Sequence, residues 1–199
     1  MHLSSARAEI TVTAARLVAE DGLEYGPAKR RAARLLGLGS RVALPDNEAI
    51  DEALRIYIEE FLSDTQPAEL LALRTLALQW MRRLERFRPY LTGAVWHGTA
   101  TRHSDIHIDL FCEDPKSAEL ALIDQRVDYE QRSSTARDGQ PVDTLSVHAK
   151  CAGLGEMVGV HLKVRDLDDL RGTLRPDSRG RVPRGNIPGV ERLLEAPAP

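Results

Sequence analysis

Acidic and imidazole side chains alternate with apolar ones in the stretch SDIHIDL, residues 104–110. Alternate residues of a β-strand point to the same face, so Asp105, His107 and Asp109 would share one face and the apolar residues the other. Carboxylates are good ligands for Mg²⁺, and imidazole suits Mn²⁺ or Zn²⁺ better. The pattern therefore predicts a metal site at Asp105, His107 and Asp109, with an exposed polar strand face as the alternative.

A glycine turn precedes this stretch in the sequence HGTATR, residues 97–102. Main-chain N–H groups at such a turn can approach phosphate oxygens closely. We therefore expect Gly98 and Thr99 to contact phosphates, with Arg102 as a nearby cation. The alternative is an ordinary hairpin turn.

The order of strand, glycine turn, SDI strand, helix and strand over residues 90–130 resembles the minimal core of the polymerase-β-type nucleotidyltransferase superfamily. In that family the turn holds a triphosphate, while Asp-x-Asp and a third acid from a later strand hold two divalent metals. The resemblance implies a nucleoside triphosphate partner, Mg²⁺ or Mn²⁺ as cofactor, and transfer of a nucleoside monophosphate to an unknown acceptor. It places Asp105, Asp109 and Asp128 in the catalytic set, with Asp143 as a second candidate for the third acid. A weaker resemblance extends to a bacterial group with a helical N-terminal half and a similar GTA turn.

The spacing of the two strand aspartates departs from this family pattern. Asp105 and Asp109 are four residues apart, which separates their Cα atoms by about 13 Å on a regular strand. Two-metal sites hold their ions only about 3.5–4 Å apart. In either possible register, His107 or Phe111 stands where the second carboxylate belongs. The alternative to an enzyme is therefore a degenerate member that binds a nucleotide, a nucleic acid or a protein.

A second constellation consists of His107, His148 and His161, which all fall on the polar side of their expected strands. If those strands are neighbours, the imidazoles could converge with Asp109 into a transition-metal site. The sequence does not give the strand order, so this convergence stays open.

A basic stretch near the N-terminus, AKRRAARLLGLGSR, suggests a different class of function. Four of its cations on an expected short helix could contact the phosphates of a nucleic acid: Lys29, Arg30, Arg31 and Arg34. The alternative is a solvated helix face whose other side packs in a core. Residues 1–88 could equally form a helical partner domain.

The spacing of apolar residues, which predicts the elements that position these side chains, changes near Pro89 from a helical period to strict alternation. Before it, apolar residues recur at helical spacing in four segments. The first has Ser4 or Ser5 as N-cap and ends at Gly22, and the second spans residues 27–36. The third follows Asp46 or Asn47 as its cap, and the fourth runs from Pro67 to Pro89. After it, strands are expected at 90–96, 104–112, 126–130, 142–149 and 157–164, with a helix over 113–124. Residues 132–141 are expected as a loop, and 165–199 as an extended tail closed by a helix at 190–195.

The whole chain sets broad bounds. It has 199 residues, 42% of them hydrophobic, and a formal net charge of −3, so nothing attracts it globally to nucleic acid or to an anionic membrane. Two cysteines without a C-x-x-C pair and no signal-like or spanning segment favour a reduced cytoplasmic protein without a membrane partner. P-loop, dinucleotide and G-x-S-x-G motifs are absent from the sequence. We predict an α+β protein: a helical domain over 1–88, a nucleotidyltransferase-like mixed sheet over 89–164, and the tail.

Overall fold

The computed structural model describes residues 2–39, 42–135, 141–171, 174 and 180–195. The chain forms two compact units. One comprises Met1–Glu69 with Thr99–Ser104, and the other comprises Leu70–Gly98 with Asp105–Pro199. Helices and a mixed sheet confirm the predicted α+β class.

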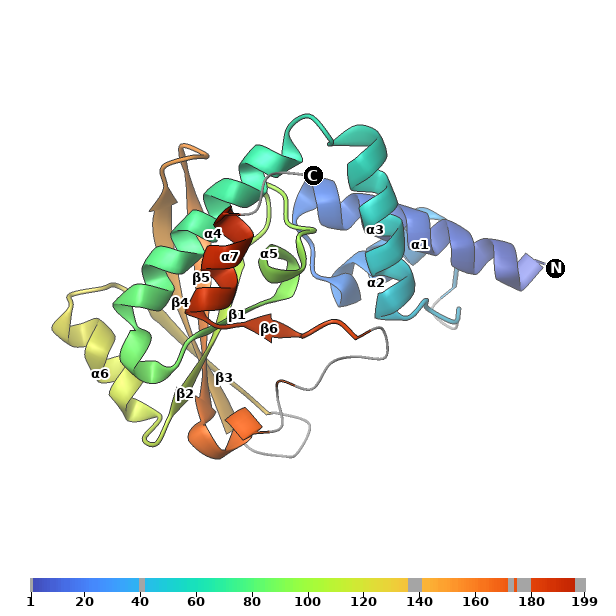
Figure 1. The fold of residues 1–199 in the computed structure, drawn as a ribbon. Helices are drawn as coiled ribbons and strands as arrows, with labels where there is room; N and C mark the ends of the chain where they lie inside the picture. Colours follow the sequence, from blue (N-terminus) through green and yellow to red (C-terminus); the bar gives the residue numbers. More distant parts are fainter. Residues whose placement is uncertain (1, 40–41, 136–140, 172–173, 175–179, 196–199) are drawn as a thin grey trace. The chain divides into compact units, whose positions relative to one another are not determined.

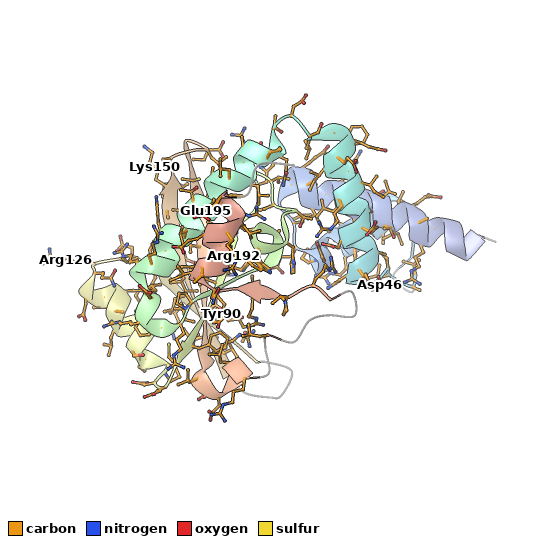
Figure 2. All side chains as sticks on the ribbon, in the orientation of Figure 1. Asp46, Tyr90, Arg126, Lys150, Arg192 and Glu195 are labelled. Carbon is orange, nitrogen blue, oxygen red and sulfur yellow. The ribbon has the colours of Figure 1, made fainter. Side chains whose placement is uncertain are left out.

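In its described residues, the first unit contains the helices α1 (His2–Asp21), α2 (Tyr25–Leu35) and α3 (Asn47–Phe61). Their apolar faces build one core around Ile10, Ala14, Ala28, Ala32, Ile50 and Leu54. The start of α3 is as predicted, because the Asp46 carboxylate accepts a hydrogen bond from the Ala49 amide at 2.8 Å (Figure 2). The predicted cap of α1 at Ser4 or Ser5 is wrong, because the helix already begins at His2.

The loop Thr99–Ser104 belongs to this helical unit although it lies far along the chain. Its Thr101 hydroxyl donates to the Ala19 carbonyl at 2.8 Å, and its Ala100 carbonyl accepts from the Gln66 side chain at 2.8 Å. Gly22 makes room for the loop: a Cβ there would lie 2.2 Å from the His103 carbonyl oxygen. The loop is therefore anchored to the helical unit by two specific hydrogen bonds, one from a side chain and one to its main chain.

The second unit contains the sheet. Its helical elements are α4 (Gln66–Arg83) from Leu70 onward, η1 (Glu85–Phe87), α5 (Gly93–His97), α6 (Lys116–Asp124), η2 (Leu167–Arg171) and α7 (Ile187–Glu195). Its strands are β1 (Tyr90–Thr92), β2 (Ile106–Cys112), β3 (Glu130–Thr135), β4 (Pro141–Cys151), β5 (Glu156–Asp166) and β6 (Arg184–Gly185).

The six strands lie in the order β3-β4-β5-β2-β1-β6, and β2 and β5 are the parallel pair. One face of the central strands is apolar and buried, with Ile106, Ile108 and Leu110 on β2 and Val160 and Leu162 on β5. Figure 1 shows α4 and α7 in front of the strands. The opposite face of β2 and β5 carries the polar residues singled out above.

Several expected elements differ from the structure. The fourth helix, expected to run to Pro89, ends at Arg83 and is followed by η1. Residues 93–97 form helix α5 and not a strand, because Gly93 takes a positive φ of 68° that ends β1. The strand expected at 126–130 begins only at Glu130 and continues to Thr135, so part of the expected loop is strand; residues 136–140 lie outside the described part. The expected tail contributes β6, which pairs with β1.

Candidate functional site on the polar face of the sheet

Residues directly opposite each other on paired strands share one face of a sheet. Ser146 pairs with His161, His161 with His107, His107 with Thr92, and Thr92 with Arg184. One polar row therefore crosses five strands. Two residues along, a second row contains Thr144, Lys163, Asp109 and Tyr90. We call these two rows, with Asp105 and Arg165, the polar face.

Asp105 is fixed on this face by two hydrogen bonds. Its Oδ2 lies 3.1 Å from Nε2 of His161, and its Oδ1 accepts from the Gly159 amide at 3.1 Å. The hydrogen bond with His161 is the main reason that the Asp105 pKa is lowered from its usual value. Gly159 is required for this approach, because a Cβ there would lie 2.6 Å from the Asp105 oxygen.

His161 has further partners on the same face. Its Nδ1 lies 2.9 Å from the Ser146 hydroxyl, and its ring stacks on His107 with centroids 4.9 Å apart. His148 shares the face but pairs with Gly159, which lies two residues before His161 on β5. The structure therefore brings His107 and His161 together, with His148 in the next row.

Asp109 is buried, with 4% of its surface exposed, and lies between two arginines. Its Oδ2 lies 3.0 Å from Nε of Arg165 and also contacts Nη1 of Arg184. Tyr90 and Phe111 pack edge to face beside this cluster, with ring centroids 5.6 Å apart. Burial lowers the Arg184 pKa, and the Asp109 charge acts against that shift.

The charge of this cluster is positive. Asp109 faces the guanidinium groups of Arg165 and Arg184, and Lys163 stands beside Asp109 in the sheet register. The negative charge of Asp169 also acts on Arg184, so these three cations face two carboxylates. Such an arrangement attracts anions and repels metal cations. Arginine and lysine side chains are also good donors to phosphate.

The two candidates for a third acid lie elsewhere. Asp128 precedes β3, the edge strand, and two strands separate β3 from β2. At about 4.8 Å per strand, this puts the start of β3 about 14 Å from β2, which carries His107 and Asp109. Asp143 alternates with Thr144 on β4, so it belongs to the opposite face, where it accepts hydrogen bonds from Gln131 and Ser133. The structure does not bring either acid to Asp105.

Three main-chain N–H groups of the glycine turn are already engaged. The Gly98 amide donates to the Ala94 carbonyl at 2.9 Å in the second unit. In the first unit, the Thr101 amide donates to the Ser104 hydroxyl and the Arg102 amide donates to the Glu69 carboxylate at 2.9 Å, while Thr99 is buried. A phosphate at this turn would have to displace internal acceptors, one of them an anion.

The donor set does not fit a pair of Mg²⁺ ions. Asp109 is already neutralised by two guanidinium groups, His107 replaces an oxygen ligand, and Asp128 lies at the sheet edge. Within the ranges that the structure describes, no group of three or more His, Cys, Asp or Glu side chains is placed to hold a metal ion. His107, His148 and His161, which are all described, likewise do not form such a group.

Sequence reasoning missed the partners that decide the chemistry of this face. Arg184 lies in a segment without periodicity, and nothing in the sequence pairs that segment with β1. The alternation in VGVHLKVR, residues 158–165, does place His161, Lys163 and Arg165 on one side of a strand. That signal could have identified the cationic neighbours of Asp109.

The predicted nucleic-acid contacts do not form one exposed surface. Lys29 is buried and its ammonium donates to Asn47 at 2.6 Å, and Arg31 is paired with Asp21 at 3.0 Å. Arg30 and Arg34 are exposed and line a cavity of about 450 Å³ with apolar side chains around them. The basic stretch is therefore divided among three different environments.

No protein-family description and no curated protein matches the chain. Solved structures that resemble it include Cid1 poly(U) polymerase bound to MgATP, at 18% identity and a TM-score of 0.35 over 48% of this chain and 32% of that one. A cytoplasmic RNA terminal U-transferase matches at 18% identity and 0.34, over 53% and 33%. Cid1 with the UTP analogue UMPNPP matches at 18% and 0.36, over 58% and 36%. The chain thus spans about a third of the length of these structures.

A search of the helices in the described ranges finds none with the length and apolar character needed to cross a membrane.

Proposed function

We propose that the chain is a nucleotidyltransferase-like protein that binds nucleoside triphosphates through the polar face without a two-metal centre. The observation that carries the proposal is the charge around Asp109. Asp109 contacts Arg165 and Arg184 and has Lys163 as its register neighbour. Asp169 also acts on Arg184, so three cations outnumber two carboxylates and the cluster has a net positive charge. Polyphosphate is the ligand class that this charge favours.

The neighbouring groups suit the rest of a nucleotide. Tyr90 supplies partly exposed aromatic surface beside the cations and packs against the buried Phe111, and aromatic faces stack on bases of any type. His107 and Thr92 continue the polar row toward Arg184. The phosphates would contact Lys163 and the two guanidinium groups, with the base toward Tyr90.

The competing proposal is metal-dependent transfer of a nucleoside monophosphate by Asp105, Asp109 and Asp128, with Gly98, Thr99 and Arg102 at the phosphates. It requires Asp109 to leave two guanidinium partners and Asp128 to move in from the sheet edge. Both requirements weigh in favour of binding without that chemistry.

The first test is titration of the full chain with fluorescent ATP and UTP analogues, with Mg²⁺ and with EDTA. We expect binding that survives EDTA and weakens with salt, because phosphate contacts are screened. Lys163→Gln should weaken binding about tenfold, since a hydrogen bond to a charged group contributes about 1.5–3 kcal/mol.

Lys150→Gln is the matched control, because Lys150 is exposed near the β4–β5 turn (Figure 2). It lies six residues of strand, about 20 Å, from the Lys163 row. Binding that requires Mg²⁺ and is accompanied by covalent transfer of the nucleotide would overturn the proposal in favour of the competing one.

A further inference from the structure

Three side chains on neighbouring strands form one hydrogen-bonded chain on the polar face. The hydroxyl of Ser146 on β4 lies 2.9 Å from Nδ1 of His161 on β5. Nε2 of the same ring lies 3.1 Å from the carboxylate of Asp105, which precedes β2. A hydroxyl within hydrogen-bond distance of an imidazole that is oriented by a third group is the arrangement of an activated nucleophile.

The direction of these hydrogen bonds follows from the chemistry of the groups. The Asp105 carboxylate is ionised at neutral pH and only accepts, so a neutral His161 carries its proton on Nε2. Nδ1 is then the free base, and it accepts from the Ser146 hydroxyl. Asp105 therefore fixes the tautomer that makes His161 a proton acceptor for Ser146.

The ring of His161 is also held in place on its flat side. It stacks on His107 at an interplanar angle of 28°, and its register partner across the parallel pair is that same residue. The Asp105 carboxylate is held by the Gly159 amide as well as by the ring. Ser146 and His161 both remain partly exposed, so a small molecule can reach the hydroxyl.

Three other serines in the described part of the second unit bond to oxygen and not to imidazole. Ser133 donates to the Asp143 carboxylate, Ser134 to the Val142 carbonyl and Ser117 to the Asp114 carbonyl. Carboxylate and carbonyl oxygens are weaker bases than a neutral imidazole, so they accept the serine proton less readily as its oxygen attacks a carbonyl carbon. Ser146 therefore has a partner that the other three serines lack.

We propose that Ser146 is a nucleophile that accepts acyl groups from activated esters, an activity beyond the proposed nucleotide binding. The Ser146 oxygen forms a bond to the carbonyl carbon, its proton passes to Nδ1 of His161, and the bond from the carbonyl carbon to the leaving oxygen breaks. His161 then returns the proton to the leaving alkoxide. Water, deprotonated by the same nitrogen, cleaves the serine ester and regenerates the hydroxyl. Asp105 is the positioning residue for this base.

The test is labelling of the full chain with a fluorophosphonate probe and with p-nitrophenyl acetate, followed by peptide mapping. We expect the label on Ser146 and a rate about 100-fold lower in His161→Gln, the range for loss of a general base. Ser134→Ala is the matched control, because Ser134 lies on the adjacent strand with its hydroxyl on a carbonyl, and its labelling rate should equal that of the unsubstituted chain.

Two outcomes would overturn the proposal. One is wild-type labelling of Ser146 no faster than that of Ser134, a comparison that needs no variant to fold. The other is an undiminished rate in a folded His161→Gln chain. For Asp105→Asn, ¹⁵N spectra of the histidines should show loss of the single Nε2-protonated form of His161, which a merely structural role would leave in place. Nucleotide titration with Lys163→Gln is independent of Ser146, so failure of this inference is separable from failure of the proposed function.

Discussion

At the scale of single residues, Asp105 links stability to pH. Its folded-state pKa is lowered, first by the hydrogen bond with His161. A carboxyl with a lowered pKa contributes stability above its unfolded pKa of about 3.9, and that contribution disappears as the pH falls through the lower folded value.

We therefore expect the unfolding free energy to fall more steeply below about pH 4 in the natural chain than in Asp105→Asn. Urea unfolding at a series of acidic pH values measures this slope. His161→Gln should flatten the slope in the same way, because it removes the largest cause of the shift. Parallel slopes in all three chains would contradict this role for the hydrogen bond.

Substitution of Asp109 measures a different effect, the contribution of a buried ion cluster to the free energy of unfolding. Replacing it with asparagine leaves Arg165 and Arg184 facing each other without the carboxylate that they share. Removing one partner from a buried pair costs about 3–5 kcal/mol, because the remaining charge stays desolvated. Denaturant unfolding of Asp109→Asn should show a loss of this size.

The control for Asp109→Asn is Glu191→Gln. Glu191 pairs with Arg82 at 2.7 Å, but both side chains are well exposed. Exposed pairs contribute about 0–1 kcal/mol, so this variant should be close to the natural chain in stability. An equal loss in the two variants would show that burial of Asp109 does not determine its contribution.

At the scale of elements, substitution of two glycines distinguishes the cost of backbone strain from the cost of a steric clash. Gly22 and Gly37 have nearly the same positive φ, 66° and 67°, but only Gly22 would bring a Cβ onto another backbone group, 2.2 Å from the His103 oxygen. Gly37 has nothing within 4 Å of that position.

Gly37→Ala should cost about 1–2 kcal/mol, the penalty for a left-handed residue with a Cβ. Gly22→Ala should cost more than that, because the loop Thr99–Ser104 must also move away. Thermal or denaturant unfolding of the two variants gives the difference directly. Equal losses would mean that the loop adapts to the added carbon without cost.

The elements also show what the sequence could and could not predict. Period-3.6 patterns located α2 and α3 well, and strict alternation located β2, because burial on one side leaves a direct imprint on residue order. The change from strand to helix at Gly93 depends on a single positive φ, and β6 is only two residues long. Neither leaves a periodic signal.

At the scale of the molecule, the site was predictable only in part. The sequence identifies Asp105, His107 and Asp109 as sharing one face, and the structure agrees. It does not show that Arg184, 75 residues after Asp109, neutralises that aspartate. Strand order is a tertiary property, and here it turns an expected cation site into a positively charged cluster.

The position of the loop Thr99–Ser104 has a consequence for how the protein is made. A ribosome releases the chain from its N-terminus, and domains generally fold in that order. The Ala19 carbonyl and the Gln66 amide, however, find their partners only in residues synthesised after α4, β1 and α5. The helical unit therefore cannot form these two hydrogen bonds until part of the sheet unit has been translated.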